Sequence, residues 1–328
     1  MNRAGHKIFY FCSTPHALFS APLLAMPPPA HHTNDVAPMK VVGFTIIKNA
    51  ILYDYPVVEA IQSVLPLCDD FVVSVGRSDD ATLELIRGLG NPKIRIMETE
   101  WDLSKREGGE VLALETNKVI NEMGKAFDWA FYIQADEVLH EQHIDAVREA
   151  MLQHRHHDQV DGLLFRYLHF YGSYDYIGTS SRWYSHEIRV FKPGRGVYSF
   201  RDAQGFRKAN NEMLWVKEID ACIHHYGWVK PPEAMQEKQL NFNKLWHNDQ
   251  WIEKHVGHAR EFDYSNVDSL VRFTGTHPKV MQPRINAMNW TFDFDVSFSR
   301  LKPKDRVKGL LKRWFGWDLN YRNYKVLP

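Results

Sequence analysis

The sequence predicts an α/β protein, built on a mostly parallel sheet that helices cover on both faces. Three observations lead to this class. From residue 41 to about residue 152, short β-branched or apolar runs alternate with segments of helical spacing. The spacing of this alternation is typical of βαβ units, whose strands lie parallel in one sheet. The composition, with 44% hydrophobic and 24% charged residues, is that of an ordinary globular protein.

The elements follow one another in a regular order. Four apolar runs are expected to be strands, namely 41–47, 71–75, 94–97 and 129–133. The segments of helical spacing are 57–65, 81–89, 110–123 and 143–152. Further strand-like runs lie at 162–170, 187–191 and 219–225, and a polar helix is expected from Pro232, since proline is accepted in a first helical turn. Ligands of parallel sheets bind beyond the carboxyl ends of the strands, so the informative residues should follow each run.

Composition divides the chain into four segments. Residues 1–38 carry three consecutive prolines and four histidines with little periodicity, which predicts a disordered leader or an over-extended start before Met39. Residues 39–230 are expected to form the main α/β domain. Residues 231–300 are expected to form a helical extension packed on it, and residues 301–328 a basic amphipathic tail.

The tail has the pattern of a surface helix. Lysines and arginines surround an apolar face made by Val307, Leu310, Leu311, Trp314 and Trp317. This pattern suits a helix that lies on an anionic membrane surface. The alternative is a last helix docked on its own domain with a solvated basic face.

Charge and cysteine content argue against several classes. The 40 basic residues balance 40 acidic ones, which argues against a nucleic-acid binder. The three cysteines, Cys12, Cys68 and Cys222, form no CxxC pair, so a reduced compartment is favoured over a disulfide-stapled secreted fold. No stretch reaches the roughly 18 apolar residues that span a bilayer. The protein is therefore expected to be cytoplasmic, and at most peripheral at the inner face of the membrane.

The chemistry is expected where the fourth strand ends. Residues 131–138 run from an apolar strand into two adjacent carboxylates, Asp136 and Glu137. Such oxygen ligands can hold Mg²⁺ or Mn²⁺ against a diphosphate, and the ion neutralises the charge that grows on a departing nucleotide. The alternative is that Asp136 begins a turn and caps the next helix.

Three strand ends carry a further pattern. They are Ile47-Lys48-Asn49, the run from Gly76 to Thr82, and Gln134-Ala135-Asp136-Glu137. Together they resemble glycosyltransferase family 2, over roughly residues 40–230. The resemblance implies a GT-A fold, a nucleotide-sugar-binding catalytic domain, and a metal held by Asp136, the last acid of the family's Asp-x-Asp motif.

Two positions depart from the family pattern. Gln134 stands where the motif begins with Asp, so we expect either that the metal is held more weakly or that Gln134 hydrogen-bonds the ribose or sugar of the donor instead. No carboxylate stands at Val75 or Gly76, where the family contacts the base, so the donor nucleotide is left open. Asp80 is retained, either as a donor contact or as a helix cap.

The resemblance also implies a histidine near the end of the catalytic domain and a carboxylate that acts as the general base. Alternation along a strand sends His224 and His225 to opposite faces, and we favour His225 as a metal ligand beside Asp136 and Glu137. The alternative is a histidine at the strand end that is hydrogen-bonded to the backbone. Asp202 is the first candidate for the base and Glu187 the second, with pairing to a neighbouring arginine as the alternative for each. The expected donor contacts are Lys48, Asn49, Asp80, Gln134, Arg189, Arg207 and Tyr226.

Aromatic side chains are expected to contact sugars, since their flat apolar faces suit the C–H faces of a sugar ring. Core packing is the commoner fate of such residues, so two of a set of five are expected to serve. The set is Tyr171, Tyr174, Tyr176, Trp183 and Trp228.

The expected function is a metal-assisted glycosyltransferase, and the family resemblance implies that the transfer is inverting. It would move a sugar from a nucleotide-diphosphate donor to a glycan or a lipid-linked acceptor, as in the synthesis of cell-envelope polysaccharide. One alternative, suggested by Gln134 and Val75, is a nucleotide-sugar-binding protein of the same fold without turnover. The other is a sugar-phosphate nucleotidyltransferase, although the first strand is followed by no glycine-rich phosphate loop.

Overall fold

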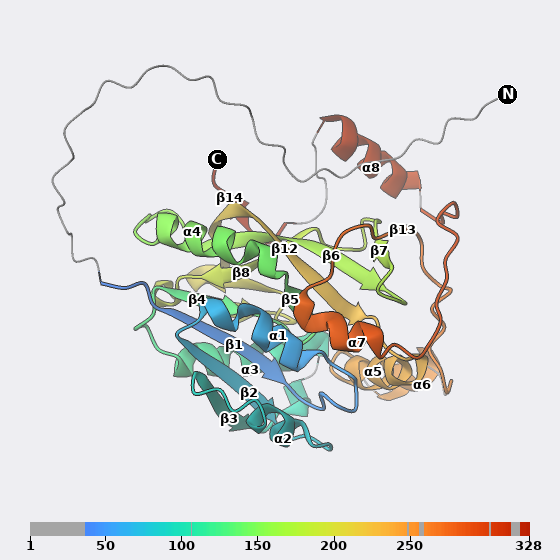
Figure 1. Ribbon diagram of the computed structural model, residues 1–328, viewed down its shortest axis with the longest axis horizontal. Coiled ribbons are helices and arrows are strands. Elements are labelled where there is room, and N and C mark those ends of the chain that lie inside the picture. The colour runs from blue at the N-terminus through green and yellow to red at the C-terminus, as the bar shows by residue number, and fades with distance from the viewer. Residues whose placement is uncertain (1–36, 106, 248, 256–258, 302, 316–321) are drawn as a thin grey trace. The chain divides into compact units, whose positions relative to one another are not determined.

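Four parallel strands form the first half of the central sheet in the computed structural model (Figure 1). β1 (Val41–Ile47) lies between β2 (Asp70–Gly76) and β4 (Trp129–Tyr132), and β3 (Ile94–Thr99) pairs with β2 at the edge. All seven residues of β1 are buried, because both faces of the sheet are covered. The α/β class predicted from the sequence is confirmed.

The structure describes residues 37–328 apart from 106, 248, 256–258, 302 and 316–321. Residues Met39–Pro328 form one unit. Most of the expected leader, and Trp317 of the tail, lie outside the described residues.

The second half of the sheet contains strands of both directions. β8 (His186–Phe191) runs antiparallel to β4 on one side and to β6 (Gly162–Tyr171) on the other. β12 (Trp215–Trp228) continues the sheet parallel to β6, and β5 (Glu137–Leu139) pairs antiparallel with β12. This last pairing brings the end of β12 beside the residues that follow β4.

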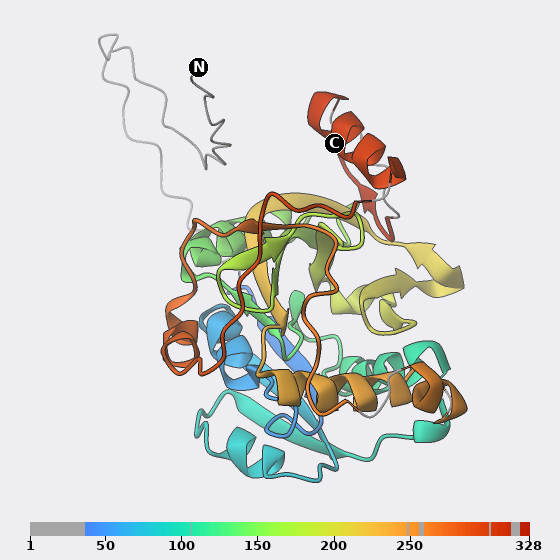
Figure 2. The ribbon, with the colours of Figure 1, turned by 90° about the vertical axis from the view of Figure 1, so that its right-hand side faces the viewer.

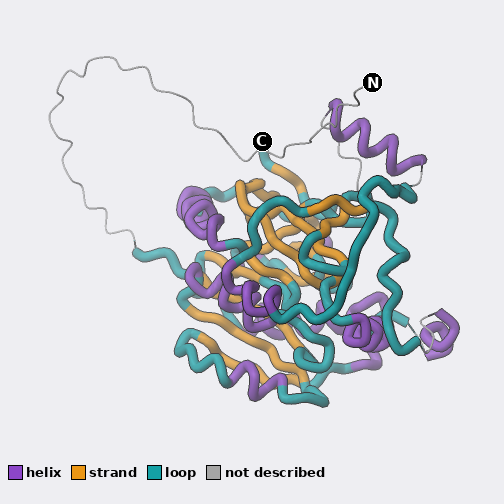
Figure 3. The backbone as a smooth tube through the Cα atoms, turned by 45° about the vertical axis from the view of Figure 1, so that its right-hand side comes forward, coloured by secondary structure: helices purple, strands orange, loops and turns teal. Residues whose placement is uncertain are grey.

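Alternation along the strands supplies two cores. On one face of the sheet, Phe71 and Val73 pack with α1 (Val57–Val64) and α4 (Ile144–His154). On the other face, Phe44 and Val72 pack with α3 (Glu110–Glu122). Side chains of neighbouring residues point to opposite faces of a strand, so a run of consecutive apolar residues is what a doubly covered sheet requires. Figure 3 shows the helices on both sides of the strands.

The remaining elements lie around this sheet. α2 (Thr82–Arg87) follows β2, and a small second sheet contains β9 (Tyr198–Phe200), β10 (Gly205–Lys208) and β11 (Glu212–Met213). The C-terminal part contains α5 (Pro232–Lys244), α6 (Asp249–His255), α7 (Gln282–Asn286), α8 (Pro303–Phe315) and two short strands, β13 (Leu270–Arg272) and β14 (Lys325–Val326). β13 pairs with β7 (Tyr176–Gly178), and β14 pairs with the start of β12.

α5 begins at the predicted proline and lies across the end of the sheet. Figure 2 shows α5 and α6 crossing the molecule next to α3. The amide of Gly109, just before α3, donates a hydrogen bond to the carbonyl of Leu245, just after α5. This contact holds the C-terminal end of α5 over the strand ends. Within the described residues, no helix has both the length and the apolar character needed to cross a membrane.

Candidate functional site

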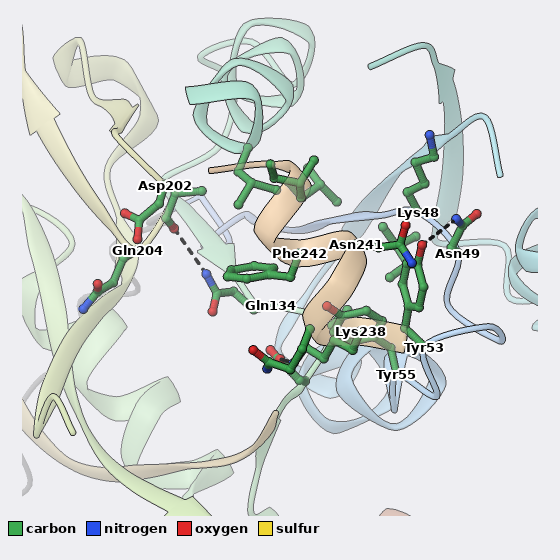
Figure 4. Close-up of a pocket in the computed structure, with 18 of the residues that line it drawn as sticks. Lys48, Asn49, Tyr53, Tyr55, Gln134, Asp202, Gln204, Lys238, Asn241 and Phe242 are labelled. Carbon is green, nitrogen blue, oxygen red and sulfur yellow. Dashed lines mark hydrogen bonds and ion pairs between the residues drawn. The ribbon is translucent and has the colours of Figure 1, made fainter. Parts of the chain in front are cut away.

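A cavity of about 730 Å³ lies beyond the carboxyl ends of the parallel strands (Figure 4). Lys48 and Asn49 line it after β1, Gln134 and Asp136 after β4, and His225 from β12. Residues of α5 form another part of its wall, namely Lys238, Gln239, Asn241, Phe242, Asn243 and Lys244. The cavity therefore occupies the position at which an α/β sheet binds ligands.

Asp136 lies among positive charges in this cavity. Its Oδ2 is 3.2 Å from the ammonium of Lys238, which also donates to the carbonyl of Gly227 at 2.8 Å. Burial by itself raises the pKa of Asp136, but the charge and hydrogen bond of Lys238, together with the charge of Lys230, outweigh it and hold this pKa well below its usual range. Asp136 is therefore ionised, as an ion ligand must be.

A chain of hydrogen bonds sets the proton of His225. Nε2 of His169 lies 2.7 Å from the carbonyl oxygen of Tyr184, which can only accept, so this nitrogen carries the proton. Nδ1 of His169 is then an acceptor, and Nδ1 of His225, 3.3 Å away, donates to it. Burial lowers the pKa of both histidines, although Asp136 opposes the shift for His225, so both rings are neutral near pH 7. The unprotonated Nε2 of His225 therefore faces Asp136.

This arrangement fits a divalent cation. Nε2 of His225 and Oδ1 of Asp136 lie 3.7 Å apart, and both are acceptors, so no hydrogen bond joins them. A cation bound by both atoms would satisfy them, and the partner on Nδ1 is the usual support of a metal-binding histidine. The described residues contain no group of three or more potential protein ligands, so further ligands would come from substrate phosphates and water.

Glu137 and Arg189 do not reach the cavity, which corrects two expectations. Arg189 donates to both carboxylate oxygens of Glu137, at 2.7 and 2.8 Å, and both side chains are fully buried. The hydroxyl of Tyr167 and the amide of Gln134 complete the partners of Glu137, at 2.9 and 3.1 Å. Glu137 is thus committed to holding the turn that presents Asp136. It is not available to a metal, and Arg189 is not available to phosphate.

The loop after β1 holds its own shape. Asn49 has a φ of +55°, and its side-chain amide donates to Asp79 at 3.0 Å and accepts from the Asp79 amide at 2.8 Å. Asp80 accepts from the amides of Ile51 and Leu52 at 2.9 and 2.7 Å, and from the amide of Thr82 at 3.0 Å. Asp80 does not line the cavity, so it acts as a cap of this loop and not as the expected donor contact. Lys48 and Asn49 do line the cavity, and their role as donor contacts stays a prediction.

The aromatic candidates separate clearly. Trp183 and Trp228 line the cavity. The side chains of Tyr171, Tyr174 and Tyr176 are buried in apolar clusters and do not line it. Tyr226 is also buried, with its hydroxyl 2.8 Å from Nδ1 of His277, so it is not the expected donor contact. The expected contacts of these four tyrosines with donor or sugar are corrected, because their side chains pack in the core.

Asp202 lies on a strained turn at the rim. Arg201 and Ala203 on either side of it have φ values of +57° and +60°, conformations that non-glycine residues hold only under constraint. A Cβ at Gly109, whose φ is +78°, would lie 2.9 Å from Cβ of Asp202, so only glycine permits this approach. Burial raises the pKa of Asp202. A carboxylate with a raised pKa is a better proton acceptor than an ordinary one.

Glu187 and Arg207 line a second cavity, of about 540 Å³, and not the first. Glu187 is 4% exposed and accepts a hydrogen bond from Gln204 at 2.7 Å. Burial raises its pKa to about 7. Arg207 donates to the carbonyl of Asn323 at 2.6 Å, so its expected role as a donor contact is corrected as well.

Sequence reasoning missed the part of the wall that α5 and the loop after β3 supply. Lys238 and Phe242 project from α5, and Phe242 lies at the centre of the view in Figure 4. Trp101 and Leu103 add an apolar surface, and Trp101 packs on Gly76, where a Cβ would lie 2.4 Å from the indole nitrogen. The glycine at the end of β2 was the signal for this close approach. The face that α5 turns to the cavity had no comparable signal, because the helix is polar on most sides.

The chain was compared with family models, curated proteins and solved structures. No family model matches it, and no curated protein matches it. Among solved structures, it is similar to residues 1–349 of TarS from S. aureus in complex with UDP, with 11% identity and a TM-score of 0.38, over 66% of this chain and 69% of that one. It spans 39% of a longer TarS structure.

Two other structures are similar over a shorter part. One is glucosyl-3-phosphoglycerate synthase from Mycobacterium tuberculosis in complex with Mn²⁺, UDP and phosphoglyceric acid, with 15% identity and a TM-score of 0.27, over 40% of this chain and 43% of that one. The other is 4-diphosphocytidyl-2C-methyl-D-erythritol synthase, with 11% identity and a TM-score of 0.32, over 49% and 78%.

Proposed function

We propose that this protein is a glycosyltransferase that takes a sugar from a nucleotide-diphosphate donor. The observation that supports this most is the pairing of an ionised Asp136 with the free lone pair of His225 at the carboxyl end of the sheet. Lys48 and Lys238 lie in the same cavity and can meet a diphosphate. Trp101 and Phe242 offer an apolar surface on which a nucleobase can lie.

Asp136 and His225 would hold the divalent ion, Mn²⁺ or Mg²⁺. When bound, the ion supplies positive charge to the diphosphate as it departs. Lys238 adds a second positive charge on the other carboxylate oxygen of Asp136. Gln134, which donates to the carbonyl of Ala203 at 3.3 Å, lies between the donor side and the turn that carries Asp202, and is placed to contact the transferred sugar.

Asp202 is the proposed base of an inverting transfer. Its carboxylate takes the proton of the acceptor hydroxyl while that oxygen bonds to the anomeric carbon. The bond from the anomeric carbon to the diphosphate breaks, and its electron pair leaves with the nucleoside diphosphate. Trp183 and Trp228 are the proposed sugar contacts, because they are the two members of the expected aromatic set that line the cavity.

The donor is identified by a thermal-shift screen of nucleoside diphosphates and nucleotide sugars, each with and without Mn²⁺. A ligand at a hundred times its Kd raises stability by about 2.7 kcal/mol, which corresponds to a rise in Tm of roughly 5–10 °C. The best nucleotide sugar should then be hydrolysed slowly, with release of nucleoside diphosphate. Asp136→Asn should abolish this release, whereas the exposed Asp145→Asn on α4 should not.

Other outcomes of this experiment separate the alternatives. Donor binding without any release of nucleoside diphosphate, in the presence of simple sugars as acceptors, would indicate a binding protein. Formation of pyrophosphate from a nucleoside triphosphate and a sugar phosphate would indicate a nucleotidyltransferase. Absence of binding by every nucleotide tested would refute the proposal.

We also propose that α8 rests on an anionic membrane surface and so brings the enzyme to a lipid-linked acceptor. Val307, Leu310 and Trp314 share one face of the helix and are 55%, 47% and 70% exposed. Lys304 and Arg306, on the same helix, are exposed and can meet anionic head groups. The test is co-sedimentation with vesicles of phosphatidylcholine alone or with 30% phosphatidylserine.

The vesicle experiment has a matched pair of variants. Trp314→Glu should reduce binding to the anionic vesicles severalfold, whereas Val296→Glu, at a position 48% exposed outside α8, should not. Equal binding of both variants, or no preference for the anionic vesicles, would contradict the membrane role of α8.

A further inference from the structure

The second cavity lies against the first and shares part of its wall. Five residues line both, namely Arg182, Trp183, Tyr184, Asp202 and Gln204. A molecule bound in the second cavity can therefore contact Asp202, which also lines the first cavity. The acceptor of a group transfer must reach the base in this way, because the base takes the proton of the hydroxyl that attacks the donor.

Positive charge dominates this second cavity. Five basic residues line it, Arg182, Arg201, Arg207, Lys308 and Arg322, against two carboxylates, Glu187 and Asp202. Burial favours the neutral form of Glu187, whose pKa is raised to about 7, so the negative charge near neutral pH is smaller still. Arginine presents a planar fork of donors that matches a phosphate or a carboxylate.

Three side chains of the lining also have unused hydrogen-bonding capacity. The indole nitrogens of Trp183 and Trp246 and Oδ1 of Asn323 are buried and have no hydrogen-bond partner among the described residues. Buried polar atoms are seldom left in this state. The hydroxyl groups of a sugar can both donate and accept hydrogen bonds of the kind that these atoms lack.

The cavity is joined to α8. The hydroxyl of Ser181, in its lining, donates to Asp305 of α8 at 2.5 Å, and Lys308 lines the cavity one turn further along the same helix. The helix α8 therefore lies beside the second cavity.

From these observations we infer that the second cavity binds the acceptor, and that the acceptor carries an anionic group, a phosphate, next to the hydroxyl that is glycosylated. This inference rests on the proposed function, because it takes the first cavity to be the donor site. Arg201 and Arg322 are the residues assigned to the anionic group. Both are exposed, and neither lines the first cavity.

The test measures binding of anionic probes to the full-length protein by calorimetry. The protein is first saturated with the nucleoside diphosphate that binds most tightly in the donor screen. Inorganic phosphate and glucose 6-phosphate are then titrated, with glucose as the neutral match. We expect both anions to bind and glucose to bind at least about tenfold more weakly than glucose 6-phosphate.

The variant is the double substitution Arg201→Gln with Arg322→Gln. It should weaken binding of both anions at least about tenfold and leave the Kd of the nucleotide unchanged within about twofold. Arg87→Gln, on the exposed face of α2, is the control and should change neither. Circular dichroism of the double variant checks that it is folded.

Three results of the titrations would overturn the inference directly, and a fourth would count against it. They are failure of both anions to bind, equal binding of glucose and glucose 6-phosphate, and equal anion binding by the wild type and the double variant. Binding of free phosphate alone would indicate an adventitious anion site and would also count against it. If no nucleotide binds, the proposed function fails by itself, and the titrations of the unliganded protein still report on the second cavity.

Discussion

Glu137→Gln is expected to destabilise the protein strongly while leaving the candidate ion ligands in place. The substitution keeps the shape of the side chain and removes its charge, so the guanidinium of Arg189 stays fully buried without a counter-charge. Removing one partner of a buried ion pair costs about 3–5 kcal/mol. Arg189 keeps two carbonyl acceptors, Ile188 at 2.9 Å and Gln204 at 3.0 Å, which favours the lower end of this range.

The assay is urea unfolding followed by tryptophan fluorescence, with ΔG taken from the midpoint and the slope. Glu98→Gln is the control, because its pair with Arg87 has side chains that are 60% and 54% exposed and should contribute less than about 1 kcal/mol. The double variant Glu137→Leu with Arg189→Met should lose less than Glu137→Gln alone. An apolar pair leaves no buried charge unpaired.

The reasoning fails if Glu137→Gln changes ΔG by less than about 1 kcal/mol while Mn²⁺ affinity falls. Glu137 would then be a metal ligand, as the sequence pattern first indicated. A loss of stability with Mn²⁺ affinity retained in the folded protein would establish its role in supporting the turn.

Three further predictions concern the surroundings of the site. Gly109→Ala should destabilise the protein more than Gly108→Ala does, with a difference of about 1–3 kcal/mol in the free energy of thermal unfolding. Both glycines have a positive φ, but only a Cβ at Gly109 would contact Asp202. Equal effects of the two substitutions would contradict the close approach of Gly109 to Asp202. Glu187 has a folded-state pKa of about 7, above its ordinary 4.5, so its contribution to stability is present below pH 4.5 and is lost as the pH rises through 7. The free energy of unfolding in urea should therefore fall less over that pH range for Glu187→Gln than for the wild type. Parallel pH profiles of the two proteins would contradict the raised pKa. His169→Phe removes the hydrogen-bond acceptor that fixes the proton of His225 on Nδ1. It should weaken Mn²⁺ binding about 10–100-fold, as measured by electron paramagnetic resonance, and His169→Gln should restore part of the affinity. Unchanged Mn²⁺ binding would show that the hydrogen bond has no such role.

Local periodicity is enough to locate most of the sheet. The run 41–47 is continuous and apolar because it is buried on both faces, and β1 occupies that range. The direction of β8 was not predictable, since an apolar run has the same pattern whichever way the strand runs. Alternation along β12 also separated His225, which lines the cavity, from His224, which does not.

The partners of charged residues were far less predictable. Glu137 and Asp136 are neighbours in the chain, and both are plausible ion ligands by composition alone. Glu137 faces Arg189, which is 52 residues away in the chain, and Asp136 faces Lys238, which is 102 residues away. Which carboxylate stays open to a ligand depends on how β8 and α5 pack around the end of β4.

The alternation of apolar runs was sufficient to predict the α/β class and the edge of the sheet at which the site lies, because such patterns reflect contacts between each element and water or core. Packing between elements far apart in the chain decided the rest. It determined which tyrosines are buried in the core, which arginine pairs with Glu137, and that α5 forms part of the cavity wall. These choices depend on distances between residues far apart in the chain, and a one-dimensional pattern does not contain those distances.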